Sequence, residues 1–306
     1  FNPSADAYLK PNGPESHTMT PIFYDPRQNV ADLETFSPSA GKPARFVALM
    51  TPEEPETGPP RVIQPVQPVT RADVYRVHDA AYVDAVFAGK ELNGFGNRDL
   101  RVPPACLWTI GSLLAASRWV LEPERGIACS PSSGFHHAGY GWGGGYCTFN
   151  GLMVVAAVLL KERPDLRIGI LDCDFHFGDG TADILAKKPA LAENIMHRTS
   201  GQHFRDGDDP DEFFLWLEES IAEMNEAECD LVLYQAGADM HIKDPLGGLL
   251  DDAQMRQRDR IVFRKLKAGI AWNLAGGYRA SSNLSNDPTL QTHRVTLLEA
   301  DSASGR

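Results

Sequence analysis

Four short apolar runs constrain this fold most, because each leads directly into a group of polar or glycine residues. The runs cover residues 126–130, 167–174, 231–236 and 269–274, and segments with helical spacing lie between them. Apolar strands that alternate with helices are typical of a mostly parallel sheet covered by helices on both faces. In such sheets, ligands bind beyond the carboxyl ends of the strands. The sequence therefore predicts an α/β fold with an open, mostly parallel sheet and a site at the C-terminal strand ends.

The segments between the runs support this alternation. Helical spacing is found at residues 73–87, 107–121, 151–162, 211–227 and 251–267. Residues 1–70 are rich in proline, with short extended pieces such as residues 21–24, and the prolines within residues 52–68 exclude a long helix there. No repeat, low-complexity tract or domain boundary is visible, so we expect residues 1–306 to form a single domain.

The run at residues 167–174 carries ionisable groups at alternate positions, namely Asp172, Asp174 and then His176. Strand side chains alternate between faces, so these three are expected to point the same way. A buried carboxylate is usually paired or bound to a metal, and an Asp with a His suits Zn²⁺ or a similar divalent ion. Alternatively, a strand end enters a polar loop in which the acids act as caps or turn formers. This segment alone leaves both interpretations open.

Functional residue types also follow the other three runs. His136 and His137 come after the first, Asp239 after the third and Tyr278 after the fourth. Each has a plain structural interpretation: a surface loop for the histidines, a helix cap for Asp239, a packing aromatic for Tyr278, and a simple turn at Asp179-Gly180. Their order and their common position at strand ends favour one functional site.

Composition excludes some functions. The net charge of −12 argues against a general nucleic-acid binder and suits a cationic substrate. Five cysteines without a CxxC pair indicate reduced thiols, as in a cytoplasm. No apolar stretch approaches the roughly 18 residues of a membrane helix, and no signal peptide is visible, so we expect no membrane partner. The chain begins at Phe1 rather than Met, which leaves open whether a segment precedes it.

A resemblance to a known family runs from about residue 43 to residue 278. Five sequence blocks carry it, in the order that the family has. They are Gly134-Phe135-His136-His137-Ala138, the block at 145–151, the block at 172–181, Gln235-Ala236-Gly237-Ala238-Asp239 with Asp244-Pro245-Leu246-Gly247, and Gly276-Gly277-Tyr278. The chain thereby resembles the histone deacetylase superfamily, which includes bacterial acetylpolyamine amidohydrolases. The resemblance implies an arginase-like α/β sheet. It also implies a zinc-dependent amidohydrolase that removes an acetyl or other short acyl group from an amine on a methylene chain.

The resemblance assigns roles to matching residues. One Zn²⁺ per chain is expected on Asp174, His176 and Asp239, leaving positions for water and the substrate carbonyl. His137 is expected to take a proton from that water and return it to the leaving amine, with electrostatic support from His136. Asp172 and Asp179 are expected to orient His136 and His137, and Tyr278 to donate to the oxyanion. Gly145 and Tyr146 are expected to line the substrate tunnel, with Phe135 and Tyr146 on either side of the methylenes.

Some positions depart from the family pattern. A structural K⁺ site would use a serine near residues 194–197, where Ile195 stands, and Tyr146 replaces the more usual phenylalanine. Asp99 is a candidate for an acid at the tunnel rim, with a surface-loop acid as the alternative.

Two other functions are alternatives to a zinc-dependent amidohydrolase. A two-metal ureohydrolase of the arginase type would need a carboxylate where Gly178 stands, and a silent acyl-lysine-binding module would have lost a ligand, His137 or Tyr278. The sequence does not distinguish between acetyl-lysine in proteins, acetylpolyamines and other small cationic acyl amines as the substrate. It also does not determine whether the protein forms a homo-oligomer.

Overall fold

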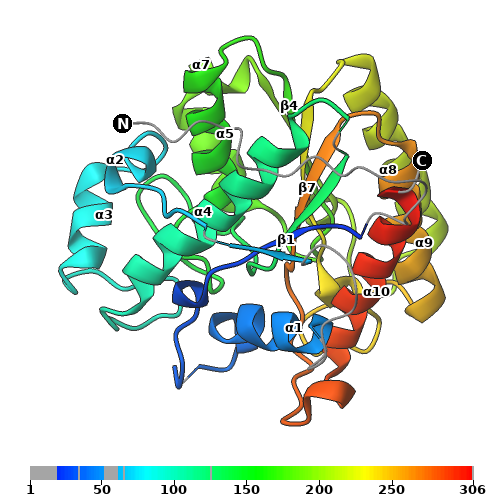
Figure 1. The fold of residues 1–306 in the computed structure, drawn as a ribbon, viewed down its shortest axis with the longest axis horizontal. Coiled ribbons are helices and arrows are strands. Elements are labelled where there is room, and N and C mark those ends of the chain that lie inside the picture. The colour runs from blue at the N-terminus through cyan, green and yellow to red at the C-terminus, as the bar shows by residue number, and fades with distance from the viewer. Residues whose placement is uncertain (1–18, 34, 52–60, 65, 125, 305–306) are drawn as a thin grey trace.

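A parallel sheet of seven strands forms the centre of the molecule in our computed structural model (Figure 1). The structure describes residues 19–33, 35–51, 61–64, 66–124 and 126–304. The strand order is β2-β1-β3-β7-β6-β4-β5, and every neighbouring pair is parallel. The strands are β1 (Ile22–Phe23), β2 (Val62–Ile63), β3 (Ile127–Ser130), β4 (Ile168–Asp172), β5 (Ile195–Thr199), β6 (Leu231–Gln235) and β7 (Gly269–Asn273).

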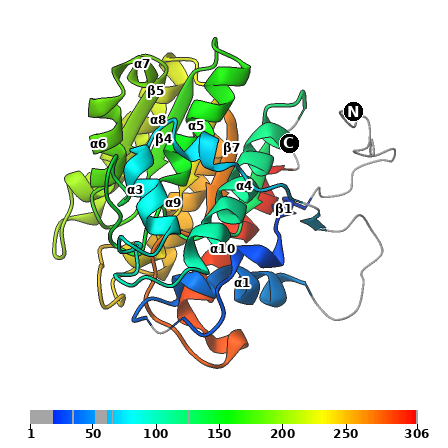
Figure 2. The same ribbon diagram turned by 90° about the vertical axis from the view of Figure 1, so that its left-hand side faces the viewer.

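Helices cover both faces of this sheet, as Figures 1 and 2 show. They are α1 (Lys42–Met50), α2 (Arg71–Val74), α3 (Ala80–Phe87), α4 (Val102–Val120), α5 (Gly151–Glu162), α6 (Asp179–Lys187), α7 (Pro189–Ala192), α8 (Pro210–Glu226), α9 (Asp252–Lys265) and α10 (Pro288–Ser304). Among the described helices, none combines the length and apolar character of a membrane-spanning segment.

Alternate side chains of each central strand enter different hydrophobic cores. On β4, Ile168 and Ile170 belong to a core shared with α4 and α5, whereas Leu171 belongs to a core shared with α8, α9 and α10. Each fully buried side chain of this size contributes roughly 1.5–3 kcal/mol. Burial on both faces explains why these strands are continuous apolar runs. The predicted α/β class with a parallel sheet and two helical layers is confirmed.

Two of the differences from the prediction have a clear physical reason. The single helix expected at residues 73–87 is wrong, because α2 ends at Val74 and Asp79 caps a new helix, α3, by accepting from the Ala81 amide. Strand β5 was missed because its middle residues are polar: it lies at the edge of the sheet, where burial is incomplete.

The four predicted strands are neighbours in the sheet, in the order β3-β7-β6-β4. Their last residues stand in register, with Ser130 beside Asn273, Asn273 beside Gln235, and Gln235 beside Asp172. All four loops that follow therefore leave from one edge of the sheet, and they carry the predicted site residues.

Candidate metal centre

Asp174, His176 and Asp239 form a cluster in which one ligand atom from each residue lies within 4.8 Å of the others. His176 Nδ1 lies 2.9 Å from Asp239 Oδ2 and 3.2 Å from Asp174 Oδ1. Both carboxylates are buried, and the imidazole is one-third exposed. Two oxygen ligands and one nitrogen ligand with an open side fit a catalytic Zn²⁺ site.

The charge balance of the cluster also fits a cation. Burial alone would lower the pKa of His176, but Asp174 and Asp239 reverse that effect and raise it to about 11. Burial and the Asp174 carboxylate raise the pKa of Asp239. A proton on His176 thus takes the place of the positive charge that two buried carboxylates require.

Backbone contacts fix the two carboxylates of the cluster. Asp174 Oδ1 accepts from the His176 amide at 3.0 Å, and Asp239 Oδ1 accepts from the Phe175 amide at 3.3 Å. Gly276 has φ +51°, and a Cβ there would lie 2.3 Å from Asp239 Oδ1. The loop after β7 can therefore reach Asp239 only with glycine at this position.

His136 lies beneath the cluster and is fully enclosed. Its Nδ1 is 2.8 Å from Asp172 Oδ2, and its Nε2 is 3.7 Å from Asp174 Oδ1. Burial opposes a charge on this ring, but Asp172 and Asp174 raise the pKa of His136 to about 9. Gln235 links Asp172 to the loop that carries His136. Its Nε2 donates to Asp172 Oδ1 at 3.0 Å, and its Oε1 accepts from the Phe135 amide.

His137 lies closer to solvent and contacts a different carboxylate. Its Nδ1 is 2.7 Å from Asp179 Oδ1, at the start of α6. Its ring centroid is 5.8 Å from that of His176 and 4.1 Å from that of His136. Gly145 packs on the ring, since a Cβ there would lie 2.3 Å from His137 Cδ2.

Two buried polar residues that sequence reasoning missed hold the histidine loop. His78 contacts the Gly139 carbonyl through Nδ1 at 2.8 Å, and its Nε2 accepts from the Asn150 amide at 2.9 Å. Asn150 caps α5 and donates to the Ala138 carbonyl at 3.1 Å. Burial lowers the pKa of His78 to about 4, so it is a neutral structural imidazole. Gln235 was missed as well, although an amide at the buried end of an apolar strand was a usable signal.

Tyr278 faces the cluster from the loop after β7. Its ring centroid is 6.5 Å from that of His176, and its amide donates to Asp244 Oδ2 at 2.8 Å. Burial and then the Asp174 and Asp239 carboxylates raise the pKa of its hydroxyl. That hydroxyl is therefore a proton-bearing donor throughout the neutral range.

The two aromatic residues expected on the tunnel wall have different surroundings. Tyr146 has φ +65°, in the left-handed region, and its ring lies 5.7 Å from that of Tyr278, next to the cluster. Phe135 is 4% exposed, and its ring lies against Gly151, where a Cβ would be 2.5 Å from Cε1. Phe135 and Tyr146 do both border a small cavity of about 60 Å³.

Two further positions differ from expectation. Asp99 is bound to Arg101, with Nη2 2.6 Å from Oδ2, so it is not a free rim acid. Ile195 begins β5 beside Ile168, at the far end of the strand from the cluster, and is wrong as the position of the expected serine. Ser200 lies at the near end, where its hydroxyl donates to the Asp174 carbonyl at 2.7 Å.

Gly178 offers no carboxylate where a two-metal ureohydrolase would need one. A Cβ at this position would lie 2.6 Å from Asp172 Oδ2, so a larger residue would displace the pair that Asp172 forms with His136.

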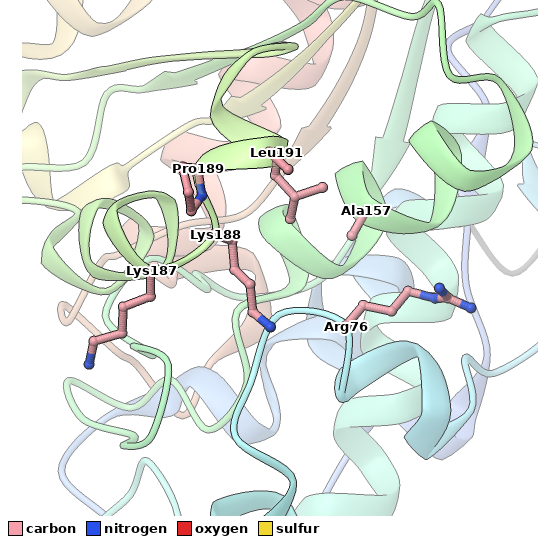
Figure 3. Close-up of a pocket in the computed structure, with 7 residues that line it drawn as sticks. Arg76, Ala157, Lys187, Lys188, Pro189 and Leu191 are labelled. Carbon is pink, nitrogen blue, oxygen red and sulfur yellow. The ribbon is translucent and has the colours of Figure 1, made fainter.

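A larger hollow of about 420 Å³ lies away from the cluster (Figure 3). Arg76, Lys187, Lys188 and Leu191 are among its lining residues. Helix α7 borders it and immediately precedes β5, so this hollow lies toward the amino ends of the strands. It has no part in the site described above.

Comparisons with known sequences identify relatives. A family model described as the histone deacetylase domain matches residues 42–212. An uncharacterized protein of Picosynechococcus sp. is 31% identical over 242 residues, which cover 72% of this chain and 79% of that protein. Histone deacetylase 18 of Arabidopsis thaliana is 30% identical, and acetoin utilization protein AcuC of Bacillus subtilis is 28% identical. Those matches cover 58% and 56% of this chain but only 29% and 53% of the two proteins.

Solved structures share the fold. An acetylpolyamine aminohydrolase from Burkholderia pseudomallei superimposes with a TM-score of 0.68 at 17% identity, covering 92% of this chain and 98% of that chain. The HD domain of HDA15 superimposes with a TM-score of 0.67 at 18% identity, covering 94% of this chain and 92% of that chain. At these identities the similarity establishes the architecture.

Proposed function

Because this chain belongs to the histone deacetylase family, we propose that it is a Zn²⁺-dependent amidohydrolase that removes an acetyl or other short acyl group from an amine on a methylene chain. The observation that carries the proposal is one constellation at one sheet edge. Asp174, His176 and Asp239 bring three metal-ligating side chains together, and the rings of His137 and Tyr278 lie near that of His176 from two other loops.

A bound Zn²⁺ would polarise the amide carbonyl and acidify the attacking water. Asp174, His176 and Asp239 would hold it. His137 takes the proton of that water at Nε2, since its Nδ1 is engaged by Asp179, and returns the proton to the departing amine. The carboxylate of Asp179 stabilises the imidazolium between these two transfers.

The other residues act on charge and position. His136, with its raised pKa, brings positive charge beneath the reacting carbonyl. The Tyr278 hydroxyl donates a hydrogen bond to the oxyanion as the carbonyl becomes tetrahedral. Gly145 and Tyr146 line the entrance, and the ring of Tyr146 beside Tyr278 is placed to contact the methylene chain.

Acetyl-lysine and acetylpolyamines both suit this site, and a net charge of −12 favours a cationic substrate. A single catalytic domain is supported by the one sheet that the described strands share. A cytoplasmic location is supported by five cysteines that are all free thiols. A structural K⁺ and a homo-oligomer stay predictions.

A side-by-side measurement tests the substrate class. We expect the Zn²⁺-loaded protein to release acetate from both an acetyl-lysine peptide and an acetylated polyamine, and the ratio of kcat/KM values to identify the preferred class. A wild-type protein that binds Zn²⁺ but hydrolyses neither would contradict the proposal.

A further inference from the structure

Lys42 is a lysine in an unusual place, at the first position of α1 and only 2% exposed. Lysine is almost never fully buried unless its ammonium has a partner. Here the Nζ donates to the main-chain carbonyl of Gly276, which is 234 residues away in the sequence. Figure 1 shows α1 beside α10, at the side where the loop from β7 returns.

Four carboxylates act on this ammonium, and two of them belong to proposed metal ligands. Burial lowers the pKa of Lys42 to about 8, while the carboxylates of Asp239, Asp174, Asp244 and Asp287 oppose that shift. On another side lies His293, whose pKa is held well below its usual range by burial and by the positive charge of Lys42. Lys42 therefore interacts electrostatically with two of the proposed metal ligands and with a buried histidine.

The loop that Lys42 holds is the one that carries Tyr278. Its start is fixed by the Lys42 contact at Gly276, and the Tyr278 amide is fixed by Asp244 Oδ2 at 2.8 Å. The backbone of Gly276 also lies close to the Asp239 carboxylate, since a Cβ there would be 2.3 Å from Oδ1. The main chain leading to Tyr278 therefore passes between the Lys42 ammonium and a proposed ligand carboxylate.

Arg45, one helical turn further along α1, contacts the same loop at a different place. Its guanidinium donates to the Ser281 carbonyl and pairs with Asp287 at 2.9 Å. Arg45 thus anchors the outer part of the loop, beyond Tyr278, and its side chain is 31% exposed. Lys42 is therefore the inner anchor of this loop, before Tyr278, and Arg45 is its outer anchor.

We propose that Lys42 is a positioning residue for the Tyr278 hydroxyl: by holding the Gly276 carbonyl it fixes that hydroxyl over the reacting carbonyl. The inference rests on the proposed function, because Tyr278 matters only if an oxyanion forms. Displacement of a catalytic group by about 1 Å can cost up to about 10²-fold in rate. The loss should thus appear in kcat, with substrate binding little changed.

The test is a double-mutant cycle of Lys42→Met with Tyr278→Phe. We expect Lys42→Met to lower kcat about 10- to 100-fold, with KM and Zn²⁺ content unchanged, and to add little further loss in the Tyr278→Phe background. Zn²⁺ affinity, measured by chelator competition without any substrate, should not fall in any of the four proteins, because Lys42→Met removes a positive charge near two of the proposed ligands. Lys42→Arg should recover part of the lost rate.

Arg45→Met is the matched control, since it removes the outer anchor. It should lower the unfolding temperature while leaving kcat close to the wild-type value. If Lys42→Met does not fold, Lys42→Arg in the two Tyr278 backgrounds supplies the same comparison. An equal loss in both backgrounds, or a loss of Zn²⁺, would overturn the role of Lys42. An inactive wild type would overturn the proposed function itself.

Discussion

The Nδ1 atom of His136 lies 2.8 Å from Oδ2 of Asp172, and both side chains are almost completely buried. Asp172 also accepts from Gln235 Nε2 and from the Asp174 amide. This carboxylate therefore connects the histidine loop, strand β6 and the loop that carries the proposed ligands. In this position the Asp172 carboxylate orients the His136 ring and favours the protonated form of that ring.

Asp172→Asn keeps the shape of the side chain but removes its charge. We expect kcat to fall about 10- to 100-fold, as for other partners that orient groups around a metal, because His136 loses the carboxylate that supports its positive charge. Steady-state kinetics and metal analysis on the same preparation check this. The control is Asp165→Asn, an exposed acid that precedes β4. Unchanged kcat in Asp172→Asn would contradict the assignment.

The proposed ligand set predicts metal content directly. Purified protein loaded with Zn²⁺ should hold about one ion per chain, as expected for a three-ligand catalytic site. Asp174→Asn should lose most of it, since the site then has one carboxylate fewer. Elemental analysis measures both, again with Asp165→Asn as the control. Two tightly bound ions per chain would be inconsistent with the one three-residue ligand cluster that the described residues form.

His137→Ala separates proton transfer from metal binding. The ring contacts Asp179 and contributes no atom to the proposed ligand set, so Zn²⁺ content should not change. We expect turnover to fall by about 10²–10⁴-fold, the usual contribution of a general acid–base group. Hydrolysis of an acetyl-lysine reporter gives the rate, and substantial remaining activity would assign proton transfer elsewhere.

His78 predicts a pH dependence of stability. Its pKa is about 4 in the folded protein and near 6.5 when unfolded. Between these values the unfolded chain binds the extra proton. Stability is therefore lost as pH falls through this window, by up to about 1.4 kcal/mol per pH unit. His197 contributes in the same direction, because burial also lowers its pKa to about 4.

A His78→Gln variant isolates this contribution. Urea unfolding at pH 7 and at pH 5 should show a smaller loss of unfolding free energy in the variant than in the wild type, because one of the titrating groups is gone. The variant should also be less stable at pH 7, by roughly 1–3 kcal/mol, since buried partners lose their hydrogen bonds. Equal pH dependence in the two proteins would contradict a neutral, buried His78.

The sequence predicted best what depends on local pattern. Apolar runs buried on both faces identified β3, β4, β6 and β7, and the bounds expected for α5 match the structure. Edge strand β5 was not predicted, because His197 and Arg198 interrupt its apolar pattern. The break between α2 and α3 was not predicted either, because the capping residue Asp79 lies inside an otherwise helical pattern.

Residues that act across long sequence separations were beyond such reasoning. Gln235 lies 100 residues from the Phe135 amide that it accepts from, and Lys42 lies 234 residues from Gly276. Gln235 has only one local signal, an amide at the end of an apolar strand, and Lys42 has no local pattern that distinguishes it from a surface lysine. The contact between the Phe135 ring and Gly151 is another that no local pattern predicts.

The most direct test of the account is metal-dependent acetate release. Protein stripped by a chelator should release no acetate from an acetyl-lysine peptide or an acetylated polyamine, and one equivalent of Zn²⁺ should restore release in the wild type but not in Asp174→Asn. Release that is undiminished in the stripped protein, or absent from wild type with Zn²⁺ bound, would contradict a zinc-dependent amidohydrolase built on Asp174, His176 and Asp239.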